Sequence, residues 1–201
     1  DLMDQVAHRD GPKILIVEDD DDVALMLQDH LEYTLQANVT VADNTADRGG
    51  GIYSEGALTL SHSVLQDNAA DGGGGIYITQ APLTISHSDF YTNTGGWRRG
   101  GGILGEDAAV SLDDVLFEGN NSNDGGGVAV DEGALQVTGS TFRKNRSEEG
   151  GAIFAIYSDV TLTGSSVYTN TTDEGCGGGI ISYMSDIALD TVRLEGNDSG
   201  E

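Results

Sequence analysis

Pairs of apolar residues separated by one polar residue recur along most of the chain. The pairs stand ten and eight positions before a regularly spaced asparagine, and they are Leu58/Leu60, Leu83/Ile85, Val110/Leu112, Leu135/Val137, Val160/Leu162 and Ile187/Leu189. Alternation with a period of two predicts a β-strand that buries one face. The asparagines are Asn68, Asn93, Asn120, Asn145, Asn170 and Asn197, at intervals of 25, 27, 25, 25 and 27 residues.

Two further strands are predicted in each repeat. Positions five and three before each asparagine are again apolar or small, as in Ser88/Phe90 and Val115/Phe117. A glycine run followed by Ile or Val opens another short strand, as in Gly73-Gly74-Gly75-Ile76. Three short strands in every 25 or so residues predict a solenoid of the parallel β-helix type, with about six coils over residues 48–201.

The asparagines and glycines have a structural explanation. Glycine at a corner supplies positive φ and lets the backbones of neighbouring coils approach closely. Asn tolerates the left-handed conformation, and its amide both donates and accepts hydrogen bonds. Stacked one coil apart, the six asparagines are expected to form a continuous amide ladder, and Asn44, 24 residues before Asn68, is expected to begin it.

The repeats resemble the polymorphic outer-membrane protein repeat, which is defined by Gly-Gly-Ala-Ile and Phe-x-x-Asn motifs. The first motif reads Gly150-Gly151-Ala152-Ile153 here, and the second reads Phe90-Tyr91-Thr92-Asn93, Phe117-Glu118-Gly119-Asn120 and Phe142-Arg143-Lys144-Asn145. Leu65, Val167 and Leu194 replace the Phe in other repeats. The resemblance implies a right-handed β-helix of the pectate-lyase-like class. It also implies a surface or secreted protein, as in autotransported adhesins.

The first 47 residues follow a different pattern. Residues 1–12 are expected to be a disordered tail, and residues 13–47 read as a β-α-β unit with strands at 14–17 and 39–42. A four-residue apolar spacing predicts an amphipathic helix over 23–35. Lys13-Ile14-Leu15-Ile16-Val17-Glu18-Asp19-Asp20 resembles the start of a response-regulator receiver domain, in which Glu18 and Asp19 are the pair that helps to hold Mg²⁺. The later receiver strands are missing, so we expect this segment to cap the solenoid, a gene fusion being the alternative origin.

The charge of the chain restricts its partners. Its net charge is −25, with nine Lys and Arg against 34 Asp and Glu, which disfavours nucleic acids and anionic membrane surfaces. No apolar run has the ~20 residues that a membrane helix needs. The single Cys176 excludes an internal disulfide. No signal peptide is visible, and we expect the chain to be a piece of a longer extracellular or cell-surface protein.

Two groups of residues are candidates for the binding face. His62, His87 and Asp114 occupy the same position, six before the asparagine, in three successive repeats, and are expected to form one surface column able to bind a metal or to act as acid and base. Trp97, Arg98 and Arg99 occupy a lengthened turn suited to a sugar ring or an acidic polymer, with Asp113 and Asp114 in the same repeat. A simpler explanation of the column is that duplication of a Ser-His-Ser segment produced two exposed histidines.

Acidic residues also recur in the turn after the asparagine. They are Asp47, Asp71, Asp124, Glu148 and Asp173. Such a column either stays solvated or collects cations, so no cofactor is required and Ca²⁺ is left open.

These observations favour a non-catalytic, adhesin-like module that binds a glycan or a surface protein on its flat face. The enzyme alternative is a polysaccharide lyase or glycoside hydrolase of the pectate-lyase-like superfamily. The third alternative is a signalling fusion with a truncated, inactive receiver. An exposed coil edge also leads us to expect end-to-end self-association.

Overall fold

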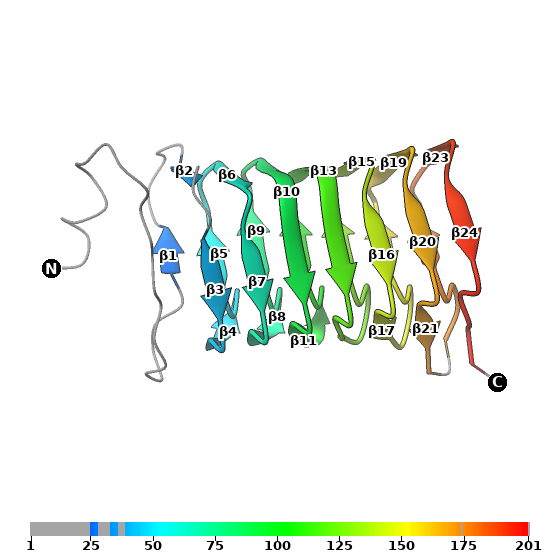
Figure 1. Ribbon diagram of the computed structural model, residues 1–201, viewed down its shortest axis with the longest axis horizontal. Helices are drawn as coiled ribbons and strands as arrows, with labels where there is room; N and C mark the ends of the chain where they lie inside the picture. Colours follow the sequence, from blue (N-terminus) through cyan, green and yellow to red (C-terminus); the bar gives the residue numbers. More distant parts are fainter. Residues whose placement is uncertain (1–24, 28–32, 36–38, 174, 201) are drawn as a thin grey trace, which may run out of the picture.

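The computed structural model describes residues 25–27, 33–35, 39–173 and 175–200. Every regular element in these ranges is a β-strand, and no α-helix occurs among them. Strands from successive coils pair in parallel and stack side by side along one shaft (Figure 1). The predicted all-β fold, a parallel β-helix of about six coils, is confirmed.

The strands of each coil pair with the equivalent strands of neighbouring coils. The first sheet receives the strand that follows the glycine run: β1 (Leu25–Leu27), β5 (Ile52–Ser54), β9 (Ile76–Thr79), β12 (Ile103–Glu106), β14 (Val128–Asp131), β18 (Ile153–Ile156) and β22 (Ile180–Tyr183). The third sheet lies after the asparagine and consists of β4 (Thr45–Arg48), β8 (Ala69–Gly72) and β11 (Thr94–Arg99), with β17 (Arg146–Ser147) and β21 (Thr171–Thr172) as a separate pair.

The second sheet is the largest, and it bends at a corner. Before the corner lie β2 (Tyr33–Leu35), β6 (Leu58–Ser61), β15 (Ala134–Thr138), β19 (Asp159–Thr163) and β23 (Ile187–Asp190). After the corner lie β3 (Thr40–Ala42), β7 (Val64–Gln66), β16 (Thr141–Arg143), β20 (Ser166–Tyr168) and β24 (Arg193–Glu195). Two long strands run through it, β10 (Leu83–Tyr91) and β13 (Ala109–Glu118).

The core forms because equivalent residues of successive coils sit directly above one another. Leu83 pairs with Leu58 on one side and with Val110 on the other, and all three are buried. Phe90, Phe117 and Phe142 stack with ring centroids 4.7 Å apart. Since each apolar column is continuous, each coil buries its inward face against the coils before and after it.

The asparagines form a single hydrogen-bonded file through the shaft. Each side-chain Nδ2 donates to the Oδ1 of the asparagine in the next coil, from Asn44 through to Asn197, over 2.8–3.0 Å. Asn120 shows the full pattern: its Nδ2 donates to Asn145 Oδ1 and to the carbonyl of Phe90, and its Oδ1 accepts from the backbone N–H and Nδ2 of Asn93. A buried amide is thereby satisfied without water.

The glycine runs let neighbouring coils pack backbone against backbone. Gly100 has φ +68°, and at Gly101 an added Cβ would lie 2.3 Å from the carbonyl oxygen of Gly126. Any larger residue at Gly101 must therefore push two coils apart, which explains why the run recurs in every repeat.

The helix predicted over residues 23–35 is wrong in the part of that segment that the structure describes. Leu25–Leu27 and Tyr33–Leu35 are strands, paired in register with β5 and β6. The open edges of β5 and β6 offer unpaired backbone N–H and C=O groups. Pairing with these edges overrides the local helical spacing. The strand expected at 39–42 is present as β3, on the edge of the second sheet. The 1–12 tail, the strand at 14–17 and the pair Glu18 and Asp19 lie outside the described residues.

The ladder predicts a specific loss of stability. Asn120→Ala leaves two buried donors of Asn93 without an acceptor, so we expect a loss of at least about 3 kcal/mol in the free energy of unfolding. Asn121→Ala is the matched control, because that neighbouring side chain is exposed, and its effect is expected to stay within about 0.5 kcal/mol. Urea unfolding followed by circular dichroism measures both variants. Equal midpoints for the two would show that the ladder contributes little.

Candidate functional site: a groove on the flank of the shaft

The outward face of the second sheet, after its corner, carries a dense set of polar and aromatic side chains. We call this face the flank; its outward positions lie four and two residues before each asparagine. They include Asp89 and Tyr91 on β10, Leu116 and Glu118 on β13, Thr141 and Arg143 on β16, and Tyr168 on β20. The parallel register brings these side chains, 25 or more residues apart in sequence, into adjacent rows.

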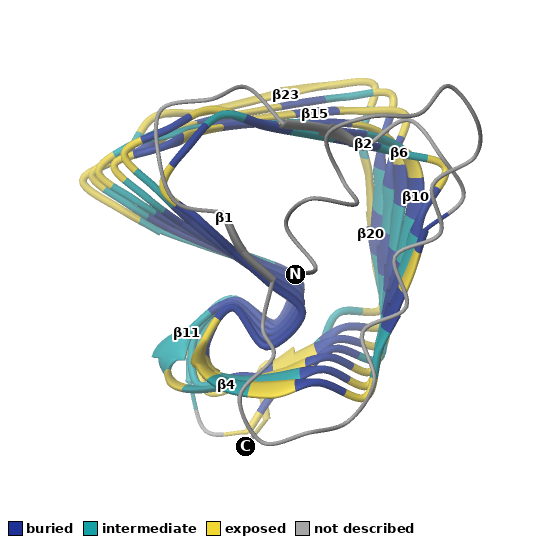
Figure 2. Ribbon diagram, turned by 90° about the vertical axis from the view of Figure 1, so that its left-hand side faces the viewer, coloured by how far each residue is buried: buried dark blue, intermediate teal, exposed yellow. Residues whose placement is uncertain are grey.

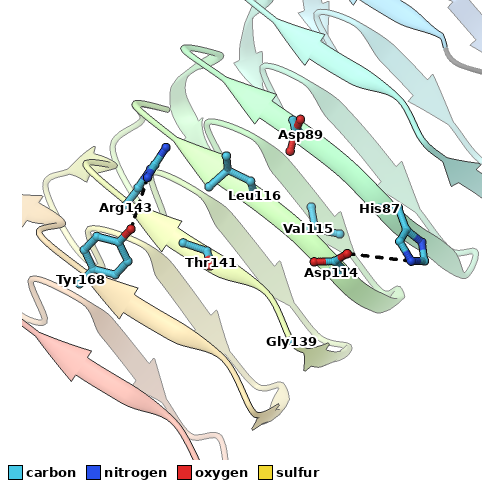
Figure 3. Close-up of a pocket in the computed structure, with 9 residues that line it drawn as sticks. All are labelled: His87, Asp89, Asp114, Val115, Leu116, Gly139, Thr141, Arg143 and Tyr168. Atoms are coloured by element: carbon cyan, nitrogen blue, oxygen red, sulfur yellow. Dashed lines mark hydrogen bonds and ion pairs between the residues drawn. The ribbon is translucent and has the colours of Figure 1, made fainter.

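A groove of about 420 Å³ runs across four coils of the flank (Figure 3). Its lining residues are His87, Asp89, Asp114, Val115, Leu116, Gly139, Thr141, Arg143 and Tyr168. One end carries acidic groups and an imidazole, and the other end carries a guanidinium and a phenol. The groove therefore offers hydrogen-bonding groups of both signs beside apolar surface.

The predicted column of His62, His87 and Asp114 lies along the corner of the second sheet. The two imidazole rings stack with centroids 4.9 Å apart and planes 4° apart, and His87 Nε2 lies 3.9 Å from Asp114 Oδ2. All three residues adopt left-handed backbone, with φ between 49° and 54°. Gly139 and Gly164 take the same position in later coils, with open space where a Cβ would lie, so the column ends there.

The opposite end of the groove is organised by Arg143. Its Nη2 lies 2.5 Å from Glu118 Oε2, and its Nη1 lies 3.4 Å from the Tyr168 hydroxyl. Lys144 Nζ contacts the same carboxylate at 2.8 Å. Hydrogen bonds from Lys144 and then Arg143 lower the pKa of Glu118. Arg193 lies over the Tyr168 ring, 5.7 Å from its centroid.

Trp97, Arg98 and Arg99 lie on a different side of the shaft. They belong to β11, which lies at the lower left of the cross-section in Figure 2, whereas β10 with His87 lies at the right. Trp97 is 64% exposed, and the Arg98 guanidinium stacks on it at 4.7 Å. The predicted binding face is thus divided between two surfaces, and Asp113, next to Asp114, lies outside the lining of the groove.

Arg99 has a structural role. Its Nε lies 3.0 Å from Asp124 and its Nη1 lies 2.7 Å from Asp131, with the guanidinium 4.7 Å from the Phe154 ring centre. Phe154 belongs to a second apolar cluster on the outer side of the first sheet, with Tyr53, Tyr77, Leu104 and Ala129. Burial raises the pKa of Asp124, and the contact with Arg99 opposes that shift. Arg99 contacts both carboxylates and the Phe154 ring, and it thereby holds β11 over this apolar cluster.

The acidic turn residues do not converge. Asp124 pairs with Arg99, and Asp173 Oδ1 lies 2.6 Å from Arg146 Nε. Over residues 39–173 and 175–200, no three His, Cys, Asp or Glu side chains come together in a way that suits a metal ion. Within the part of the chain that the structure describes, no helix has the length and apolarity needed to span a bilayer.

Sequence reasoning missed Asp89, Thr141, Arg143 and Tyr168. The signal was available, because these residues occupy the polar positions that alternate with the buried Phe or Val of the same strands. Their types vary from coil to coil, however, so no repeated motif marks them.

Comparison with protein families agrees with this geometry. A family model described as right handed beta helix region matches residues 36–199. The chain belongs to the right-handed β-helix region family. No curated protein and no solved structure gives a significant match. The match begins at residue 36 and therefore includes β3 and β4. These two strands belong to the coils of the right-handed β-helix, although they fall in the segment that was expected to resemble a receiver.

The role of Arg99 in the β-helix can be tested by its effect on stability. Arg99→Met leaves Asp124 and Asp131 unpaired although each side chain is at most 30% exposed, so we expect a loss of about 1–3 kcal/mol at pH 7. Arg98→Met is the control, with little expected change, because its guanidinium stacks only on the exposed Trp97.

The loss should depend on pH in a defined direction. Without Arg99 the folded-state pKa of Asp124 rises further above its unfolded value, so the folded state takes up a proton more readily and gains stability as the pH falls through that pKa. The deficit of Arg99→Met relative to wild type should therefore shrink between pH 7 and about pH 4.5. Urea midpoints at both values measure it, and a deficit that widens on acidification contradicts this assignment.

Proposed function

We propose that this protein is a non-catalytic, extracellular or cell-surface β-helix module that binds a glycan chain along the flank groove. The observation that carries the proposal is the composition of the groove lining: a tyrosine, an arginine, two carboxylates and a threonine surround one continuous depression. Binding sites for small and extended ligands combine apolar or aromatic surface with a few fixed polar groups. Sugar rings, which have both kinds of surface, match this lining.

The dimensions of the groove favour an extended ligand. Apart from Gly139, which precedes β16, its lining residues come from β10, β13, β16 and β20, which belong to four successive coils. Three steps of about 4.8 Å between strands give a length of about 14 Å. Because side chains on a β-helix change from coil to coil while the backbone repeats, successive units of a polymer meet different side chains in a fixed order.

The enzyme alternative has less support. A lyase or hydrolase needs a positioned acid and base at the reacting bond. Enzymes of the pectate-lyase-like superfamily use several carboxylates together with an Arg or Lys for this purpose. Of the two candidate arginines, Arg99 is already held by Asp124 and Asp131. Among the described residues, the pair His87 and Asp114 belongs to no group of three His, Cys, Asp or Glu side chains arranged to hold a metal ion.

The surface placement rests on the resemblance to the polymorphic outer-membrane protein repeat. The Phe and Asn of its Phe-x-x-Asn motif are the residues that stack here as Phe90, Phe117 and Phe142 and as the amide ladder. Proteins that carry this repeat are mostly exported, which supports an encounter with glycans outside the cell.

A glycan array followed by calorimetry tests the proposal. Tyr168→Ala should weaken binding by about fivefold or more, which corresponds to about 1 kcal/mol for loss of an aromatic contact in the groove. Tyr157→Ala is the matched control, because Tyr157 is 53% exposed and does not line the groove.

Incubation of the same glycans with the wild-type protein should release no new reducing ends and no unsaturated uronides. Measurable turnover would favour the lyase or hydrolase instead. A panel in which no glycan binds, together with capture of a protein partner that depends on Tyr168, would replace the glycan by a protein ligand.

A further inference from the structure

The cations of the flank are concentrated at one end of the groove. The whole chain has only nine Lys and Arg and a net charge of −25. Three of these cations, Arg143, Lys144 and Arg193, lie around Glu118 and Tyr168. A local positive group in so acidic a protein calls for a functional explanation.

Among the described residues, two carboxylates form ion pairs with these three cations. Arg143 and Lys144 share the single carboxylate of Glu118, while Arg193 pairs with Glu195. One positive charge is therefore left over next to the groove. The Nη1 of Arg143 donates to the Tyr168 hydroxyl and its Nη2 donates to Glu118, while its Nε–H is buried without an acceptor among the described residues. Each Nη carries two N–H groups in a planar fork that fits carboxylate and sulfate oxygens, so Arg143 has Nη donors left for an anionic ligand.

The other end of the groove has the opposite charge. Asp89 and Asp114 line it, and Asp113 stands next to Asp114. His87 lies 3.9 Å from Asp114 and stacks on His62 at 4.9 Å. An anionic group of a ligand is therefore favoured at the Arg143 end.

We propose that the flank groove selects anionic glycans. The Arg143 end holds a carboxylate or sulfate group of one sugar, beside Tyr168. This inference rests on the proposed function, and it adds the chemical class of the glycan.

Matched polymers test the charge preference. Polygalacturonate is compared with its fully methyl-esterified form, and dextran sulfate with dextran, by calorimetry at pH 7.5 and 0.15 M salt. Each charged polymer that fits the groove should bind at least about tenfold more tightly than its neutral counterpart. The overall negative charge of the protein repels polyanions and is screened beyond about 8 Å at this salt, so such a preference must arise from local contacts. Binding of only one charged polymer supports the proposal and identifies carboxylate or sulfate as the group recognised.

Substitutions locate the preference in the groove. Arg143→Gln should weaken binding of the charged polymer by about fivefold or more, whereas Arg98→Gln, on β11, should leave it unchanged. If Arg143→Gln lowers the urea midpoint, Lys144→Gln replaces it, since the Lys144 side chain is 66% exposed.

The outcomes separate this inference from the proposed function. Equal binding of charged and neutral polymers, or equal effects of Arg143→Gln and Arg98→Gln, overturns the anionic selectivity. If Tyr168-dependent glycan binding persists in that case, the proposed function stands. If none of the four polymers binds, the proposed anionic selectivity is wrong, and the glycan array alone decides the proposed function.

Discussion

The hydrogen bond from each buried asparagine to the asparagine of the next coil is the interaction on which the rest of the structure depends. It fixes the register, because the amide of one coil has its acceptor only when the next coil stands directly above it. The same register stacks Phe90 on Phe117 and Phe117 on Phe142. Glycine corners make the stacking possible, since an added Cβ at Gly101 would overlap the neighbouring backbone. The residue types at interior positions therefore change little from coil to coil, whereas those at outward positions are free to vary.

The flank groove is a consequence of this division. Strands β10, β13, β16 and β20 bury one side chain and expose the next, so each buried Phe or Val is followed by an outward residue in a defined place. Asp89, Leu116 and Thr141 form one outward row, and Tyr91, Glu118, Arg143 and Tyr168 form another. An outward surface made of four different coils is obtained without any change in the backbone, and side chains of opposite charge stand at the two ends of its groove.

The sequence was sufficient for the interior and insufficient for the surface. The spacing of Asn68 to Asn197 and of the paired apolar residues predicted the coils, because each residue type there answers a repeated physical requirement. The helix over 23–35 was wrong because pairing with β5 and β6 decided that segment, and single-chain periodicity does not contain this contact. Trp97 and Arg99 were expected on one binding face with His87, but their strand β11 lies on another side of the coil from β10. Arg143 and Tyr168 were missed because nothing repeats at their position.

The central claim is that the amide ladder holds the coils in register, and hydrogen exchange of the asparagine side chains measures this most directly. In an NMR experiment on the labelled protein, the Nδ2 protons of Asn68, Asn93, Asn120, Asn145 and Asn170 should exchange only through opening of the shaft, with protection close to that of the core backbone amides. The Nδ2 protons of the exposed Asn121 are the internal reference for unprotected exchange. Exchange of the ladder protons as fast as those of Asn121 would contradict the account.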